Sequence, residues 1–540
     1  MSGKRVLALY GALLFCFAGV LCRLFWLAGR QDYAARAKAQ STVTLELPPQ
    51  RGNFYDCQGL PLTGLEDRWL ALCFPGQGNY ARLYAYADAD GQGLLYRSRS
   101  QAAPFLVELG QDRSGQGVPC YRVPRRYARV PLCTHLLGYL DSTGQGASGL
   151  EKALEPLLAG TGARDVLVCP VTARGTLRAG QAVERVRQDS GAVDVQLTLS
   201  RSVQRAAEAV AAQEMQRGCI LVLDTATAAL RACVSLPGYD PENLAASLEA
   251  PDSPFLNRAL QSYAVGSVFK PVLAAAALEA GLAPAYQCTG AVVVDGQVFR
   301  CAGGVPHGQV DLADALARSC NGCFIRLGQQ LGAQTLCKLA GEMGFGQPVW
   351  LAEGLWAHGG TLPEPEELAQ SGQLANFSFG QGRLLASPLQ VAAMMNTIAN
   401  GGVFRAPYVL ERTLEQSTGR EQTAFPHPQA RQVLGPRTAA ALRAMLEQTV
   451  TQGTAKDADG LVGGAGGKTG TAQTGQFTPE GVETKNLWFA GFYPAHSPRY
   501  TIVVLQDGCV EAEQSSAAVF ARLCRALYWL EEKAADETGE

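Results

Sequence analysis

Residues 264–271 read Ala-Val-Gly-Ser-Val-Phe-Lys-Pro and open a run of Ala, Leu and Val that continues to Leu282. The run has few helix breakers, so it predicts a buried helix that begins at about Ser267. Pro271 then falls in the first helical turn, where its missing N–H leaves no carbonyl unpaired. Residues three apart share a helix face, so the Lys270 amine can reach the Ser267 hydroxyl. A buried lysine that loses its charge can take the proton of a serine and activate it as a nucleophile.

A Ser-x-x-Lys tetrapeptide alone is weak evidence, because it occurs by chance on the surface helices of many long chains. Two further motifs follow it in the chain. Ser319-Cys320-Asn321 is a Ser-x-Asn, and residues 468–471 read Lys-Thr-Gly-Thr. Ser-x-x-Lys, Ser-x-Asn and Lys-Thr-Gly together form the active-site set of penicillin-binding proteins and serine β-lactamases. The three motifs therefore predict a serine acyl-transfer site.

Composition sets limits on the function. The chain has 540 residues, enough for two or three domains, and a net charge of −2, which gives no electrostatic case for binding nucleic acid. Its histidines are scattered without metal-ligand spacing, so we expect no catalytic metal and no cofactor. They are His135, His307, His358, His427 and His496. Among sixteen cysteines, Cys320 and Cys323 lie three apart, which suits a metal only with partners that the sequence does not reveal.

The N-terminus predicts a membrane anchor. Residues 6–28 contain a single charge, Arg23, and are long enough as a helix to cross a hydrocarbon core of about 30 Å. No cleavage signature follows, so an uncleaved signal anchor is favoured over a cleaved signal peptide. Lys4 and Arg5 favour a cytoplasmic tail at residues 1–5, with the rest of the chain outside the cytoplasm.

Residues 29–189 predict a non-catalytic pedestal. This segment is polar, rich in Gly and Arg, and shows short strand-like runs with turn signals. Arg51 begins an Arg-Gly-Asn-Phe-Tyr-Asp turn, and Gly149-Leu-Glu151 opens a helix that runs to Leu158. Neither place brings a nucleophile beside a base.

Residues 190–535 predict an α+β domain, followed by a short tail at 536–540. Two strands before a helical insert and three after it predict one antiparallel sheet of five, with helices packed on its faces. The expected sheet strands cover 219–224, 229–235, the stretch around Lys468, 486–492 and 500–505, and the expected flanking helices cover 200–215 and 515–531.

The sequence resembles the class B penicillin-binding proteins, which are monofunctional peptidoglycan transpeptidases, and it is similar to their division- and sporulation-specific members. Besides the three active-site motifs, the resemblance rests on Arg51-Gly-x-x-Tyr-Asp56, His135-Leu-Leu-Gly-Tyr139, Gly149-Leu-Glu151, Asn257-Arg-Ala-Leu260, Ser378-Phe-Gly-Gln-Gly382 and Ser387-Pro-Leu-Gln390. It covers nearly the whole chain. One departure is Val265, where the family usually has proline, and we expect it to affect the stiffness of the turn more than the chemistry.

The resemblance implies the catalytic roles. Ser267 would attack the carbonyl of the penultimate D-Ala of a stem peptide, with Lys270 as the base. Ser319 would lie between Lys270 and Lys468 and relay a proton to the departing D-Ala. Asn321 would orient Lys270, and the charge of Lys468 would help to keep Lys270 neutral.

The resemblance also implies how the substrate is held. The hydroxyls of Thr469 and Thr471 would bind the terminal carboxylate of the donor. The backbone N–H groups of Ser267 and Thr471 would form the oxyanion hole. Gly470 would be required because a side chain there would obstruct a substrate that lies along the strand.

The implied partners are stem peptides that end in D-Ala-D-Ala, β-lactams, a polytopic glycosyltransferase and a cell-wall synthesis complex. Three alternatives stay open: a β-lactamase that uses Glu364 or Glu366 for deacylation, a D,D-carboxypeptidase with water as acceptor, and a scaffold or β-lactam sensor. The sequence does not distinguish elongation, division and sporulation roles.

The cysteines near the second motif suggest redox control. If Cys301 and Cys320 come within reach, a disulfide between them would distort Ser319 and Asn321 and switch off the site. Cys288 with Cys301, across an intervening hairpin, is an equal alternative. The simplest interpretation is that these are buried thiols in surroundings that do not oxidise them.

Overall fold

The computed structural model describes residues 3–29, 41–48, 51–74, 80–161, 164–172, 174–188 and 191–538. They form two compact units: unit 1 contains 1–50, 65–126 and 161–191, and unit 2 contains 51–64, 127–160 and 192–540. The expected boundary between residues 189 and 190 lies outside the described residues. Two segments of the expected pedestal, 51–64 and 127–160, belong to unit 2, so one cut in the chain does not separate the units.

Helix α1 (Gly3–Ala28) contains the expected anchor, and its first turn overlaps the expected tail at 1–5. It is apolar, with a mean hydropathy of 2.0, and within the described part of the chain it alone is long and apolar enough to cross a membrane. Its length and composition fit the membrane anchor that the sequence predicts.

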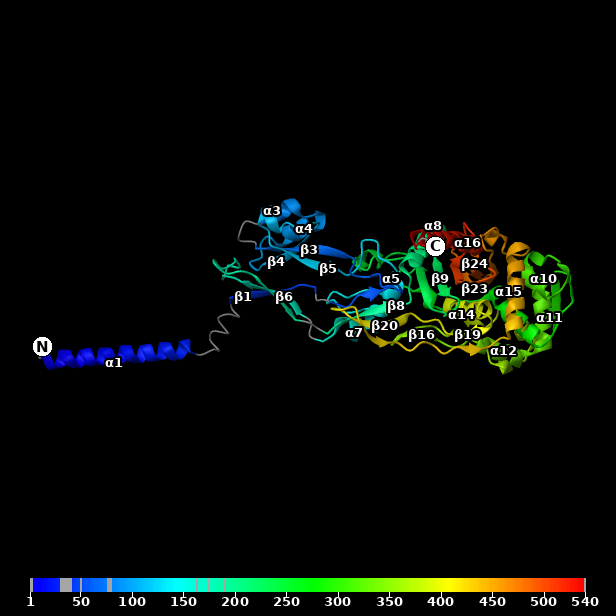
Figure 1. The fold of residues 1–540 in the computed structure, drawn as a ribbon, viewed down its shortest axis with the longest axis horizontal. Helices are drawn as coiled ribbons and strands as arrows, with labels where there is room; N and C mark the ends of the chain where they lie inside the picture. Colours follow the sequence, from blue (N-terminus) through cyan, green and yellow to red (C-terminus); the bar gives the residue numbers. More distant parts are fainter. Residues whose placement is uncertain are drawn as a thin grey trace. The chain divides into compact units, whose positions relative to one another are not determined.

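Unit 1 contains two small sheets (Figure 1). One has the order β4-β3-β5 and carries α3 and α4, and the other has the order β1-β6-β7. The bounds are β1 (Thr42–Glu46), β3 (Glu66–Cys73), α3 (Tyr80–Tyr86), α4 (Ala89–Ser98), β4 (Phe105–Leu109), β5 (Cys120–Arg125), β6 (Arg164–Pro170) and β7 (Glu184–Gln188).

The expected antiparallel sheet of five is confirmed in unit 2, with the order β10-β9-β25-β24-β23. Its strands are β9 (Gly218–Asp224), β10 (Leu230–Leu236), β23 (Gly466–Phe477), β24 (Glu483–Tyr493) and β25 (Tyr500–Cys509). Hairpins join β9 to β10, β23 to β24 and β24 to β25. A long insert separates β10 from β23. The sheet therefore brings distant parts of the chain together.

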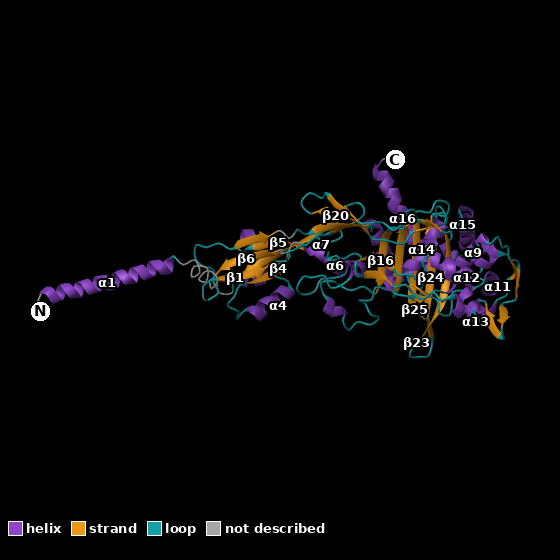
Figure 2. Cartoon of the chain, turned by 90° about the horizontal axis from the view of Figure 1, so that it is seen from below, coloured by secondary structure: helices purple, strands orange, loops and turns teal. Residues whose placement is uncertain are grey.

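Both faces of this sheet are buried under helices (Figure 2). Along β9, Ile220 and Val222 pack into one core with α8 (Arg201–Glu214) and α16 (Ser516–Thr538). Leu221 and Leu223 point the other way, into the core that contains α14 (Pro388–Ala399). Alternate side chains of a strand face opposite sides, so an apolar run such as this one fits a middle strand. Helix α16 continues to Thr538, so the expected tail at 536–540 begins inside a helix.

In the insert between β10 and β23, α-helices account for more residues than strands do. Its main helices are α9 (Lys270–Glu279), α10 (Leu312–Ala317), α11 (Asn321–Leu331), α12 (Ala333–Glu342), α13 (Ser371–Ser378), α14 and α15 (Pro436–Thr451). Its short strands are β11 (Tyr263–Ala264), β12 (Tyr286–Cys288), β13 (Ala291–Val294), β14 (Gln297–Arg300), β15 (Gly308–Val310), β16 (Val349–Ala352), β17 (Leu355–Ala357), β18 (Leu385–Ala386), β19 (Val403–Phe404) and β22 (Arg431–Gln432).

A second sheet of unit 2 has the order β2-β8-β20-β21. Its strands are β2 (Phe54–Tyr55), β8 (Val193–Leu197), β20 (Leu410–Glu415) and β21 (Glu421–Ala424), and the short helices α5 (Thr134–Leu137), α6 (Gly149–Ala153) and α7 (Glu155–Ala159) also belong to this unit.

A buried ion pair links two of the motifs that carry the family resemblance. Arg51 Nε donates to Glu151 Oε2 at 2.9 Å, and a terminal nitrogen of the same guanidinium donates to Glu155 at 2.5 Å. The Glu151 side chain is fully buried, and its other oxygen accepts from the Tyr127 hydroxyl at 3.3 Å. The first turn of the expected pedestal is thereby tied to α6.

We expect Glu151→Ala to lower the free energy of unfolding of unit 2 by up to about 3 kcal/mol, the low end for a broken buried ion pair, because only Glu155 then remains to pair with the Arg51 charge. Urea unfolding of the full chain in detergent measures this change. Glu421→Ala, which breaks the exposed pair with Arg412, is the control and should cost less than about 1 kcal/mol. Equal losses in the two variants would contradict the prediction.

Candidate active site

The nucleophile turn, residues 264–271, is tighter than the sequence predicted. Ser267 lies in a 3₁₀ turn, η5 (Gly266–Phe269), and the α-helix begins only at Lys270, with Pro271 in its first turn as expected. Side chains at i and i+3 of a 3₁₀ turn are eclipsed, so Ser267 and Lys270 still share a face. Ser267 is half-buried, whereas Val265 and Lys270 are fully buried.

The Lys270 amine is bound by the second motif. Its Nζ donates to the Ser319 carbonyl at 2.7 Å, to Ser319 Oγ at 3.1 Å and to Asn321 Oδ1 at 2.6 Å. Among the described residues, no hydrogen bond joins this amine to Ser267 Oγ. Catalytic hydrogen bonds are often long before substrate binds, so Lys270 remains the nearest candidate for the base.

Ser319 lies between two lysines. The Nζ of Lys468 also donates to Ser319 Oγ at 3.1 Å, the same distance as that from Lys270. Ser319 has a positive φ of 55°, which is uncommon for a residue with a side chain, and it lies in the turn that ends α10, where a left-handed residue is often found. It follows α10, and a hydrogen bond from the Cys320 N–H to Ala315 closes the turn.

Burial changes the protonation of both lysines. Burial lowers the pKa of Lys270 to about 7, although the neighbouring Cys320, Cys301 and Cys323 act in the opposite direction. Burial, followed by the charge of Lys270, also holds the pKa of Lys468 well below its usual range. Desolvation is the cause of the lowered pKa of Lys270, and the charge of Lys468, which the resemblance implies would help to keep Lys270 neutral, is not among its causes.

The third motif lies on β23 at the edge of the five-stranded sheet. Lys468 and Ala472 point into the protein and are fully buried, whereas Thr469 is half-buried and Thr471 is exposed on the opposite side of the strand. This alternation places the two threonine hydroxyls on one accessible face, as binding of a carboxylate requires. Thr454 was not predicted from the sequence, and its hydroxyl lies 2.7 Å from that of Thr469.

The structure adds a second reason for glycine at position 470. A Cβ at this position would lie 2.9 Å from Val268 Cγ1 and 3.2 Å from the Val265 carbonyl oxygen, both in or next to the nucleophile turn. The glycine therefore allows β23 to pack directly against η5. The contact that excludes a side chain is with the protein itself, not only with a substrate along the strand.

Gly380 also supports the nucleophile turn, a role that the sequence did not reveal. Its carbonyl accepts a hydrogen bond from the Gly266 N–H at 2.8 Å. A Cβ on Gly380 would lie 1.9 Å from the Gly266 carbonyl oxygen. The quoted Ser-Phe-Gly-Gln-Gly motif therefore touches the residue that precedes Ser267.

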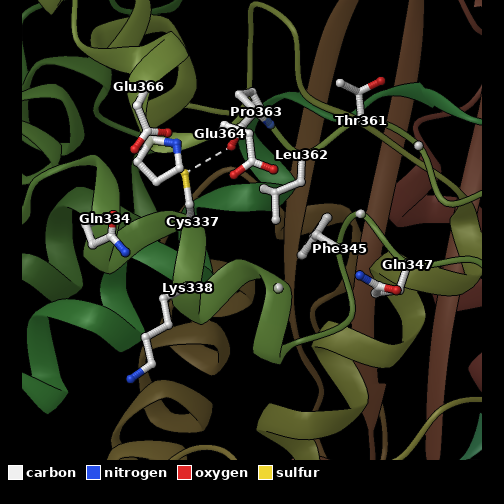
Figure 3. Close-up of a pocket in the computed structure, with 14 residues that line it drawn as sticks. Gln334, Cys337, Lys338, Phe345, Gln347, Thr361, Leu362, Pro363, Glu364 and Glu366 are labelled. Atoms are coloured by element: carbon white, nitrogen blue, oxygen red, sulfur yellow. Dashed lines mark hydrogen bonds between the residues drawn. The ribbon is translucent and has the colours of Figure 1, made fainter.

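A pocket of about 580 Å³ lies elsewhere in unit 2, and none of its lining residues belongs to the three motifs. Glu364 and Glu366 are among those residues, with Cys337 beside them (Figure 3). Glu364 caps the short helix η7 (Pro365–Leu368) together with Glu367. The structure thus assigns Glu364 a local structural role and gives no contact that supports either carboxylate as a deacylating base.

The redox candidates Cys301 and Cys320 are neighbours, with Sγ atoms 4.0 Å apart, and Cys288 Sγ lies 3.7 Å from Cys301 Sγ. Both distances are far longer than a disulfide bond, and all three cysteines are free thiols. His307 lies against Cys288, so the partners that the sequence did not reveal are present beside Cys320.

Comparison with known proteins agrees with this geometry. Residues 218–525 match the family model "Penicillin binding protein transpeptidase domain". The chain belongs to the penicillin-binding protein transpeptidase family. Within this family it is 31% identical over 480 residues to "Peptidoglycan D,D-transpeptidase PbpA" of Mycolicibacterium smegmatis, covering 83% of this chain and 88% of that protein.

Two further members show how broad the likeness is. "Stage V sporulation protein D" of Bacillus subtilis is 29% identical over 400 residues, which cover 71% of this chain and 60% of that protein. A chain from the structure titled "Structural coordination of polymerization and crosslinking by a peptidoglycan synthase complex" has a TM-score of 0.70 and 26% identity, and covers 98% of this chain and 99% of that one. The class B resemblance seen in the sequence is confirmed.

Proposed function

We propose that this chain is a serine-type peptidoglycan D,D-transpeptidase that cross-links stem peptides and is acylated by β-lactams. The observation that carries the proposal is the placement of Ser319 Oγ at 3.1 Å from each of two fully buried lysine amines, next to a serine on a tight turn. Buried amines that share one hydroxyl can pass protons to and from a reacting group. The names of the relatives agree with this chemistry.

In the first half-reaction, Ser267 Oγ forms a bond to the carbonyl carbon of the penultimate D-Ala, and its proton passes to neutral Lys270. The N–H groups of Ser267 and Thr471 stabilise the oxyanion. The bond to the terminal D-Ala then breaks, and its nitrogen receives the proton from Lys270 through Ser319. Thr469 and Thr471, next to the buried amine of Lys468, hold the terminal carboxylate, and Asn321 orients Lys270.

In the second half-reaction, an amine from a neighbouring stem peptide attacks the acyl-enzyme ester. The amide bond forms, the ester bond breaks, and Ser267 regains its proton. Lys4 and Arg5 favour an N-terminus in the cytoplasm, which would leave unit 2 outside it, where stem peptides are found. A polytopic glycosyltransferase is the natural partner, because it makes the glycan strands that carry those stems.

The test uses the full chain in detergent. We expect a fluorescent penicillin to form a stable adduct, and peptide mapping by mass spectrometry to place the adduct on Ser267. Ser262 lies five positions earlier and is the internal control, because an adduct there would contradict the proposed nucleophile.

A second assay identifies the acceptor. A pentapeptide donor that ends in D-Ala-D-Ala, with an acceptor amine present, should release D-Ala and give the cross-linked product. Release of D-Ala without cross-linking would favour the D,D-carboxypeptidase. An adduct that is lost within seconds would favour a β-lactamase, and a folded chain that forms no adduct would be a scaffold.

A further inference from the structure

Four side chains that the acyl-transfer mechanism does not use meet beside the second motif. Cys288 ends β12, Cys301 follows β14, His307 precedes β15, and Cys320 is the residue before α11. Each offers one ligand atom, and the four atoms all lie within 4.8 Å of one another. The three cysteines are at most 3% exposed. Strands and turns from a stretch of 33 residues, 288–320, thus converge on one point.

The separations fit a tetrahedral metal site. A zinc–sulfur bond of about 2.3 Å makes the edge between two sulfur ligands of a regular tetrahedron about 3.8 Å, and the edge from sulfur to a histidine nitrogen slightly shorter. The observed Sγ–Sγ distances are 3.7 Å from Cys288 to Cys301 and 4.0 Å from Cys301 to Cys320. The distance from Cys288 Sγ to His307 Nδ1 is 3.4 Å.

We propose that Cys288, Cys301, His307 and Cys320 form a structural Zn²⁺ site. Three sulfurs and one imidazole nitrogen are a ligand set that zinc takes in closed, four-coordinate sites. On binding, each thiol releases its proton to solvent and coordinates as a thiolate, and the imidazole coordinates through Nδ1. The Gly290 N–H, which donates to Cys288 Sγ at 3.4 Å, supports that ligand from outside the site.

A disulfide bond explains the positions of the four side chains less completely than a metal ion does. A disulfide joins two of the sulfurs at about 2.05 Å and leaves the third thiol and the imidazole without a role. The metal uses all four groups, whose ligand atoms lie within 4.8 Å of one another. It also protects the thiols from oxidation on the outer side of the membrane, where free cysteines are at risk.

The site would act on catalysis by positioning the second motif. Cys320 lies between Ser319 and Asn321, the two residues that bind the Lys270 amine. The Asn321 amide also donates to the carbonyl of Arg300, which precedes Cys301, at 2.8 Å. A metal that holds Cys301 and Cys320 together fixes both ends of this contact. The four ligands are thus positioning residues, because they touch neither the substrate nor its reacting atoms.

The test is the metal content of the full chain, purified in detergent with reductant and without chelator. Elemental analysis should give about one zinc per chain, and Co²⁺ in its place should show thiolate-to-cobalt charge-transfer absorption. Cys288→Ser and His307→Ala should each lower metal affinity by at least about tenfold. Removing zinc from the wild type with a chelator should slow its acylation by penicillin, and adding zinc back should restore the rate.

Cys323→Ala is the matched control, because Cys323 is a buried thiol one helical turn from Cys320 and lies outside the set of four. It should keep the zinc. The proposal is overturned if the wild type binds no zinc under reducing conditions, if Cys323→Ala loses zinc as Cys288→Ser does, or if peptide mapping finds a disulfide among these cysteines in the reduced preparation. Metal content does not depend on cross-linking activity, so this test can fail while the proposed transpeptidase stands.

Discussion

Lys270→Arg is expected to lower the rate of acylation by penicillin by about 10³–10⁴-fold, the upper range for loss of a general base. Arginine keeps the positive charge and much of the length, but its guanidinium does not give up its proton in proteins. Lysine at this position does, because burial lowers the pKa of Lys270 to about 7. Stopped-flow measurement with a fluorescent penicillin provides the rate.

The pH dependence of the wild type tests the same assignment. The base acts in its neutral form, so the acylation rate should rise by about tenfold per pH unit below pH 7 and level off above it. Lys338→Arg, at an exposed lysine on α12, is the matched control and should leave rate and profile unchanged. A flat profile between pH 5 and 8, or rapid acylation of Lys270→Arg, would exclude Lys270 as the base.

The local pattern of the sequence was enough to predict the strands and helices that carry the active-site motifs. Apolar alternation and hairpin signals identified the strands of the five-stranded sheet, and Pro271 located the start of α9 to within a few residues. The helix expected over 200–215 is confirmed as α8, and the Ser200 side chain caps it by accepting from the Val203 N–H. Each of these features is determined by residues close together in the chain and by which of them lie on the same face of one helix or strand. Both can be read from the sequence.

The contacts that the sequence did not reveal join residues that are far apart in the chain. The cluster at 288–320 has ligand gaps of 12, 5 and 12 residues, which match no short metal motif, because two hairpin strands and a helix bring the ligands together. Segments 51–64 and 127–160 were assigned to the pedestal by position, yet they pack with unit 2. Tertiary packing decides such contacts, and a single sequence that is not compared with others carries little information about it.

Gly380→Ala is expected to slow acylation by about 100-fold, because the nucleophile turn would have to move. The new Cβ would lie 1.9 Å from the backbone oxygen of Gly266, and a backbone atom cannot swing aside as a side chain can. The Gly266 N–H donates to the Gly380 carbonyl at 2.8 Å, so a shift at one residue passes to the other. Displacement of a reacting atom by about 1 Å can cost a factor of this size.

Gly382→Ala separates displacement from backbone strain. Gly382 belongs to the same motif and has nearly the same conformation, with φ of 81° against 79° for Gly380. Its Cβ would meet only the Asn376 side chain, at 3.3 Å. The left-handed backbone should cost each alanine about 1–2 kcal/mol of stability, which urea unfolding measures, and the contact with Gly266 should add to this loss in Gly380→Ala. Only Gly380→Ala should slow acylation, so an equal slowing in both would show that strain, and not the contact with Gly266, limits the site.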